Sequence, residues 1–86
     1  MYEKQNQFAC REGLEVTEIE CKLAGLSLNG KLRNNAVVVG AWNHVPKGCS
    51  IQTGSNDIHY NIKSKPTYPD YVGFGPVCNR VSQYKE

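Results

Sequence analysis

Hydrophobic and polar residues alternate most regularly near the middle of the chain, on either side of a turn. Ile58, Tyr60 and Ile62 occupy every second position, which places their side chains on one face of a strand. Residues 49–53 form a second strand-like run before them. The intervening residues 54–57 read Gly-Ser-Asn-Asp, and these residue types tolerate positive φ or cap a turn through their side chains. The pattern predicts a β-hairpin.

A helical pattern begins at residue 17. Residues 17–20 read Thr-Glu-Ile-Glu, which is the T-x-x-E form of a capping box. Apolar side chains then recur at helical spacing, at Ile19, Leu23 and Leu26. Asn29 and Gly30 supply a stop signal. We therefore expect one short helix.

Three further strands and a loop complete the predicted fold. Residues 36–39, Ala-Val-Val-Val, are typical of a central buried strand, and residues 73–78 predict a last short strand. Residues 8–10 predict a short entry strand. The two prolines within residues 63–70 indicate a loop that returns the chain across one face. The fold class is α+β, with one short helix packed on a small, mainly antiparallel sheet.

The length and the cysteines indicate a domain held by disulfides. At 86 residues the chain is expected to form one domain, residues 1–86, with its core at about residues 8–79 and polar termini. Its four cysteines contain no C-x-x-C pair, so two disulfides are favoured over zinc or redox chemistry. We favour Cys10–Cys21 and Cys49–Cys78, because each bridge then closes a local unit; the other two pairings stay open.

Disulfides indicate an oxidising compartment, so we expect the extracellular space or the cell surface, with an organellar lumen as the alternative. Residues 1–7 lack the apolar stretch of a signal peptide, so an exported form is expected to be the mature chain. The longest apolar run, residues 36–39, is too short to span a bilayer. The expected partner is a protein or a carbohydrate, with self-assembly or membership of a larger complex also open.

Charge is uneven along the chain, which carries a net +2. Residues 1–20 hold five acids against two bases, whereas residues 21–85 hold eight bases against two acids. These bases are scattered rather than clustered, which is typical of a solvated surface. Neither a recognised motif nor a basic patch interleaved with aromatics indicates nucleic-acid binding, so none is expected.

Residues 42–48, between the two central segments, contain the only Trp and are shaped by Pro46 and Gly48. Trp42 is either a core anchor or a stacking platform for a ligand. His59 and Asn61 alternate with the hairpin's apolar residues and are expected to point toward solvent or a partner. The predicted contact residues are Trp42, His44, Lys47, Gln52, His59 and Asn61.

Catalytic chemistry has weaker support. A thiol-dependent hydrolase can be assembled from Cys49 as nucleophile, His44 or His59 as base and Asp57 as orienting group, yet nothing makes these residues converge. Both histidines with a cysteine pair lack the spacing of a zinc site. Glu18 and Glu20 suit the helix dipole better than paired-carboxylate catalysis. No catalytic residue, metal or cofactor is predicted.

The motif combination W-x-x-V-P-x-G-C-S, then H-Y-N, then P-V-C, behind a cysteine-bearing helix, resembles small cysteine-containing domains in predicted exported proteins of algae and other protists. The resemblance spans roughly residues 10–79 and implies an extracellular or lumenal setting and a disulfide-supported fold. The chain is also remotely similar to PAN/apple modules, which bind proteins or carbohydrates, although residues 26–42 lack the additional cysteine of those modules.

Two functional hypotheses follow from these observations. The first is a non-enzymatic exported binding or structural module that recognises a glycan or a protein. The alternative is an accessory or building-block subunit of a larger extracellular or lumenal assembly. A thiol-dependent hydrolase is the remote third.

Overall fold

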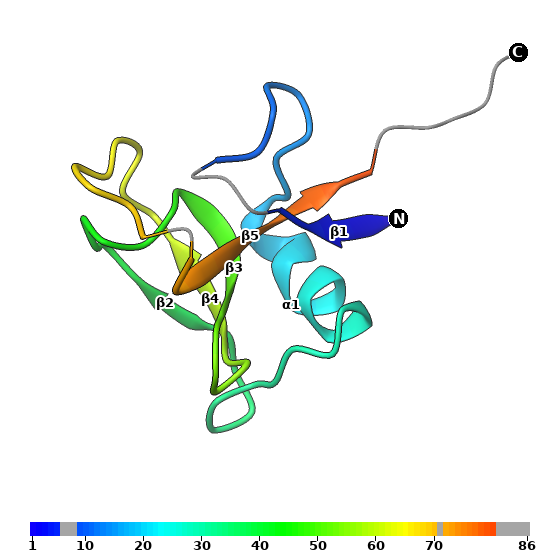
Figure 1. The fold of residues 1–86 in the computed structure, drawn as a ribbon. Coiled ribbons are helices and arrows are strands. Elements are labelled where there is room, and N and C mark those ends of the chain that lie inside the picture. The colour runs from blue at the N-terminus through cyan, green and yellow to red at the C-terminus, as the bar shows by residue number, and fades with distance from the viewer. Residues whose placement is uncertain (6–8, 71, 81–86) are drawn as a thin grey trace, which may run out of the picture.

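A single helix lies on one face of a five-stranded sheet in the computed structural model, which describes residues 1–5, 9–70 and 72–80 (Figure 1). The elements in chain order are β1 (Tyr2–Lys4), α1 (Glu18–Ser27), β2 (Val38–Gly40), β3 (Gly48–Gln52), β4 (Ile58–Asn61) and β5 (Phe74–Asn79). The strand order is β1-β5-β3-β4-β2, and every neighbouring pair is antiparallel except β2 with β4. The predicted α+β class with a mainly antiparallel sheet is confirmed.

α1 begins and ends where its sequence signals predict. The Thr17 hydroxyl oxygen accepts a hydrogen bond from the Glu20 backbone N–H at 3.2 Å, and the Glu20 carboxylate accepts one from the Thr17 backbone N–H at 3.1 Å. This reciprocal capping box satisfies two N–H groups that would otherwise lack partners. At the other end Asn29 adopts a left-handed conformation with φ 69°, and the Gly30 N–H donates to the Gly25 carbonyl at 2.8 Å.

The predicted hairpin is confirmed as β3 and β4, which pair with Ile51 opposite Ile58. The turn uses positive φ at Gly54 (97°) and Asn56 (65°). Asn56 also donates its backbone N–H to the Gln52 carbonyl at 2.8 Å. Gly54 and Asn56 therefore reverse the chain through positive φ, as their residue types predict.

The core lies between α1 and the sheet, and small helix residues let the two layers approach closely. Ile58 is fully buried in a notch between Gly25 and Gly30. A Cβ atom at either glycine would lie 2.6 Å from an Ile58 side-chain carbon, so neither position has room for a side chain. The buried cluster comprises Val16, Cys21, Ala24, Cys49, Ile51, Ile58 and Val77.

The two disulfides are present, but the favoured pairing is wrong. The bridges are Cys10–Cys78 and Cys21–Cys49, with Cα–Cα distances of 5.6 and 5.5 Å. α1 crosses the centre of the sheet, where β3 lies, so Cys21 faces Cys49. Cys10 instead lies next to β5, where its sulfur is 3.4 Å from the Val77 carbonyl oxygen. Proximity along the chain was the wrong guide because the helix packs on a strand remote in sequence.

The prediction for residues 36–39 is also wrong in part. The strand exists as β2, but it lies at the edge of the sheet and is parallel to β4, and Val39 is 48% exposed. β3 takes a central place because it is covered on both faces and paired on both sides, although its sequence, Gly-Cys-Ser-Ile-Gln, is less apolar.

The predicted entry strand at residues 8–10 is not observed in its described part, because residues 9 and 10 lie outside any strand and Phe8 lies outside the described residues. The strand that pairs with β5 is β1 instead, with Glu3 opposite Cys78. The short polar sequence of β1 carries no strand signal. These residues form a strand because their backbone pairs with β5.

Candidate functional site

The sheet face opposite α1, called the second face below, is covered by loops rather than by a helix. Alternation along β3, β4 and β5 brings polar and aromatic side chains there: Ser50, Gln52, His59, Asn61, Phe74 and Pro76. His59 and Asn61 lie on the opposite face from Ile58, as predicted. Their expected exposure is wrong, since only 6% of His59 and 1% of Asn61 is exposed. Residues 41–47 fold back over this face and remove both side chains from solvent.

Asn61 fastens that covering loop to β4. Its side-chain oxygen accepts hydrogen bonds from the backbone N–H groups of Trp42 at 2.9 Å and Lys63 at 3.1 Å. Its side-chain nitrogen donates to the carbonyl oxygens of Trp42 at 2.9 Å and Val45 at 2.7 Å. The amide thus uses both donors and two acceptor positions on main chain, which is the complete bonding a buried amide requires. Asn61 positions the loop and is not available to a ligand.

His59 forms the centre of an aromatic layer on the second face. Its ring packs edge-to-face against Trp42 with centroids 5.6 Å apart and against Phe74 at 5.3 Å. His44 adds a further edge contact to Phe74 at 5.7 Å. Such edge-to-face pairs add stability beyond simple burial. Trp42 also lies directly over Gly40, where an added Cβ would meet its ring at 2.4 Å.

Burial in this layer lowers the pKa of His59 below 6.5, because the imidazolium loses its solvation. The Asp57 carbonyl, 3.2 Å from Nδ1, and the Asp57 charge oppose this shift, while the positive charges of Arg33 and His44 add to it. His59 is therefore neutral at pH 7.

We predict that acidification below pH 6.5 destabilises the fold through His59. The unfolded chain binds a proton at its ordinary pKa of about 6.5, whereas the folded chain binds it only at lower pH. Stability is therefore complete above this pH and falls as the pH drops toward the lowered pKa. Urea unfolding at pH 7.5 and 5.5 measures the loss. His59→Phe is expected to reduce it, while His44→Gln, which removes only the smallest cause of the pKa shift, preserves most of it. An equal loss in His59→Phe would assign the effect to other groups.

The thiol-hydrolase hypothesis lacks its nucleophile, because the Cys49 sulfur is bonded to Cys21 and buried. Ser50 is the cross-strand neighbour of His59 and is also fully buried. Its hydroxyl has no hydrogen-bond partner among the residues that the structure describes, so it is not activated by the imidazole. These residues act as packing groups in the structure.

Two loops meet above the second face and bring exposed and partly buried side chains to one place. The Tyr68 N–H donates to the Asn43 carbonyl at 3.1 Å, and the Asp70 N–H donates to the His44 carbonyl at 2.8 Å. The Asn43 side chain also accepts from the Thr67 hydroxyl at 3.0 Å. These bonds hold residues 67–70 beside residues 42–44. We call the resulting set Trp42, His44, Tyr68 and Asp70 the loop surface.

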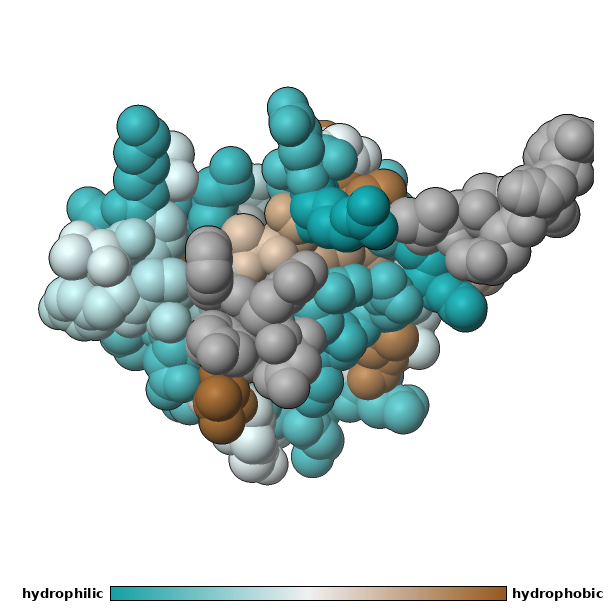
Figure 2. Space-filling view, turned by 45° about the horizontal axis from the view of Figure 1, so that its top comes forward, coloured by the Kyte–Doolittle hydropathy of each residue, from teal (hydrophilic) through white to brown (hydrophobic). Residues whose placement is uncertain are grey.

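The side chains of the loop surface differ in exposure. Tyr68 is 65% exposed, His44 and Asp70 are exposed, and Trp42 is partly buried. The Asp70 carboxylate is held by the Gly73 N–H at 3.0 Å. In Figure 2 the coloured atoms are mainly hydrophilic, and hydrophobic side chains form small separate areas. Binding at the loop surface would therefore combine aromatic contact with polar groups.

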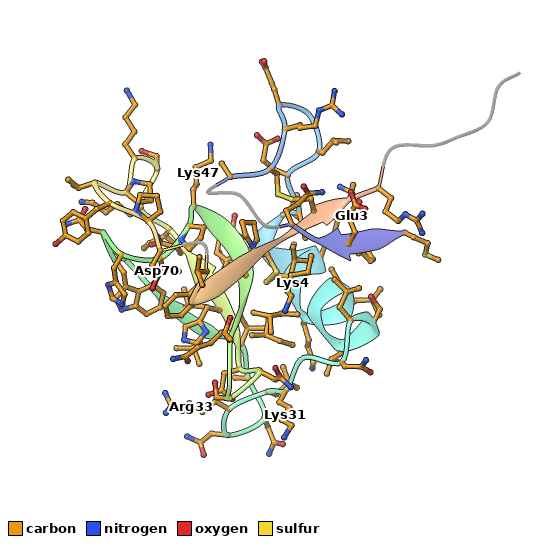
Figure 3. The ribbon with its side chains drawn as sticks, viewed as in Figure 1. Glu3, Lys4, Lys31, Arg33, Lys47 and Asp70 are labelled. Atoms are coloured by element: carbon orange, nitrogen blue, oxygen red, sulfur yellow. A yellow bond between two sulfur atoms is a disulfide. The ribbon has the colours of Figure 1, made fainter. Side chains whose placement is uncertain are left out.

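The remaining predicted contact residues lie away from this surface. Lys47 is exposed just before β3 and points away from Asp70 (Figure 3). Gln52 lies at the other end of β3, opposite Phe74, where its side chain accepts a bond from Ser55 at 3.2 Å. The structure therefore brings together Trp42 and His44 of the six predicted residues, with buried His59 beneath them.

Tyr68 and Asp70 were not among the predicted contact residues. The two prolines of their loop indicate a rigid segment, and this is the signal that the sequence offers. The position of the segment beside residues 42–44 is not a local property, because long-range hydrogen bonds hold it there. Tyr71, a further aromatic of this segment, lies outside the described residues.

Within the described part of the chain, no group of three His, Cys, Asp or Glu side chains is placed to hold a metal ion. No helix there is long and apolar enough to cross a membrane. Comparison of the chain with family models, curated proteins and solved structures gives no match. Function must therefore be inferred from the geometry alone.

Proposed function

We propose that this chain is a non-enzymatic binding module that recognises a glycan through the loop surface. The observation that carries the proposal is the exposed Tyr68, whose backbone is hydrogen-bonded to Asn43, the residue between Trp42 and His44. Aromatic side chains with a flat apolar ring and a polar atom suit the apolar faces and hydroxyl groups of a sugar. Asp70 adds a carboxylate that accepts hydrogen bonds, and His44 adds an imidazole ring.

Preorganisation supports this choice. The backbone at Trp42 and Val45 is fixed from below by three of the four Asn61 hydrogen bonds. The Trp42 ring is fixed by Gly40 and His59. A loop that is already ordered loses little conformational entropy when it binds, so even a small contact area can give measurable affinity.

We further propose that the module acts outside the cell or in an oxidising lumen. All four cysteines are bonded in two disulfides, and such bonds persist in oxidising compartments. An extracellular setting also brings the chain into contact with glycans.

A printed oligosaccharide array probed with the fluorescently labelled protein tests the proposal. We expect binding to at least one class of glycan, reduced at least tenfold by Tyr68→Ala. Tyr68 is 65% exposed, so its replacement leaves the packing intact. Trp42→Phe, which keeps a ring over Gly40, is expected to weaken binding by a smaller factor.

The matched control is Val72→Ala, because Val72 is similarly exposed at 69% but lies outside the loop surface. Its binding should equal that of the unsubstituted chain. Absence of signal on the array, or equal signals from Tyr68→Ala and the control, would refute glycan recognition at this surface.

A further inference from the structure

The outer face of α1 is apolar and unpartnered within the described chain. Ile19 is 91% exposed, Leu23 65% and Leu26 43%, and their spacing places them on one continuous stripe along the helix. We call these three residues the α1 stripe. Scattered single apolar residues are ordinary on a surface, whereas three adjacent ones on one helix face indicate an interaction site.

The orientation of the stripe follows from the core. The inner face of α1 carries small residues, because Ala24 and Gly25 must fit against the sheet and the Gly25 position touches Ile58. The Cys21–Cys49 disulfide fixes the rotation of the helix about its axis. The stripe therefore cannot turn inward, and the residues that the structure describes leave it uncovered.

The charges along α1 indicate which molecule fits. Glu18 and Glu20 lie in the first turn, and the last turn has no basic residue. Lys22 lies beside the stripe in the second turn. Lys31 and Arg33 follow the helix, and Figure 3 shows them together at the end of the molecule to which the chain runs after α1. The Arg33 guanidinium is paired there with the Asp57 carboxylate at 3.8 Å, whereas Lys31 is exposed. The first turn of α1 is thus acidic, and exposed Lys31 follows the other end of the helix. A second copy laid antiparallel places each acidic first turn toward the partner's Lys31, whereas a parallel copy brings the two acidic turns together.

We propose that α1 is a self-association surface through which two copies of this chain pair antiparallel about a two-fold axis. Ile19 of one copy then packs near Leu26 of the other, and the two Leu23 side chains meet close to the axis, as an isologous interface requires. The opposed helix dipoles are also favourable in this arrangement. The stripe and the loop surface lie on opposite sides of the sheet, so this inference does not depend on the proposed function.

The size of the stripe sets the expected affinity. A helix of 10 residues is about 15 Å long, and three side chains cover less area than the roughly 1,200–2,000 Å² of an ordinary specific interface. We therefore expect a reversible dimer with a dissociation constant on the order of 0.1 mM.

Sedimentation equilibrium between 10 µM and 1 mM protein tests the proposal. Leu23→Glu places two carboxylates against each other near the axis and is expected to weaken association at least tenfold. Val72→Glu is the matched control, because Val72 is similarly exposed but lies in the segment that precedes β5. Far-UV circular dichroism verifies that both variants keep the fold.

The antiparallel orientation is tested by exchanging charges. Glu18→Lys alone and Lys31→Glu alone are each expected to weaken association several-fold, and the double variant is expected to restore it. A dimer that the double variant does not restore would overturn the orientation. A chain that stays monomeric at 1 mM, or a dimer indifferent to Leu23→Glu, would overturn the proposal. Monomers that float with phosphatidylcholine vesicles through Leu23 would assign the stripe to a membrane surface instead.

Discussion

Replacing Cys21 and Cys49 together by alanine is expected to lower the free energy of unfolding by roughly 3.5 kcal/mol from loop closure alone. The bridge joins residues 28 apart in sequence, so its loss frees a long loop in the unfolded chain. Both sulfurs are buried, so their removal also costs packing in the core. Since α1 otherwise contacts the sheet through small residues, we expect this variant to release the helix first.

Urea unfolding with a far-UV signal measures the loss, and amide hydrogen exchange locates it. The comparison variant replaces Cys10 and Cys78, which are 68 residues apart, with an expected entropic loss of roughly 4.5 kcal/mol. That variant keeps the tie between α1 and β3, so its α1 amides should retain more protection. Equal protection of α1 in both variants would contradict the role assigned to Cys21–Cys49. Peptide mapping without reduction checks the pairing itself.

Asn61→Ala is expected to destabilise the protein by about 3 kcal/mol. It removes four hydrogen bonds, leaving the Val45 carbonyl without its partner in a buried position and the backbone groups of Trp42 and Lys63 without theirs in partly buried ones. For a domain of this size such a loss is a large share of the total stability. The urea midpoint should fall without a change in the slope of the transition.

Asn79→Ala is the matched control, because the Asn79 side chain donates one exposed bond of 3.3 Å to the Glu15 carbonyl. Its expected cost is under about 1 kcal/mol. If the two variants unfold at the same urea concentration, Asn61 does not fasten the covering loop. A tryptophan fluorescence change in Asn61→Ala alone would show directly that residues 42–45 depend on it.

The parts of the fold that were predictable from the sequence are those with local causes. The capping box at Thr17 and Glu20, the left-handed stop at Asn29 and the turn at residues 54–57 each depend on residues within a few positions of one another. These local interactions form whatever the rest of the fold is, so the sequence alone predicts them. The α+β class follows from the elements so defined.

The incorrect predictions depend on which segments, remote from one another in sequence, pair in the sheet or cover it. Strand alternation put His59 and Asn61 on the correct face, but only the fold of residues 41–47 over that face determines that they are buried. The same is true of the disulfides, because Cys21 meets Cys49 only when the helix crosses β3. Of the candidate site, Trp42 and His44 were identified from the sequence, whereas Tyr68 and Asp70 reach it through bonds that span more than 20 residues.

The two disulfides are nested, since the Cys10–Cys78 bridge encloses the whole of the Cys21–Cys49 loop. A protease that cuts one peptide bond anywhere between these outer cysteines therefore leaves two fragments still joined by covalent bonds. A cut between residues 21 and 49 leaves them joined by both bridges. The exposed loop containing Tyr68 can thus be nicked without the chain separating. Wherever the chain meets a protease, a single cleavage between the outer cysteines therefore leaves one covalently joined molecule.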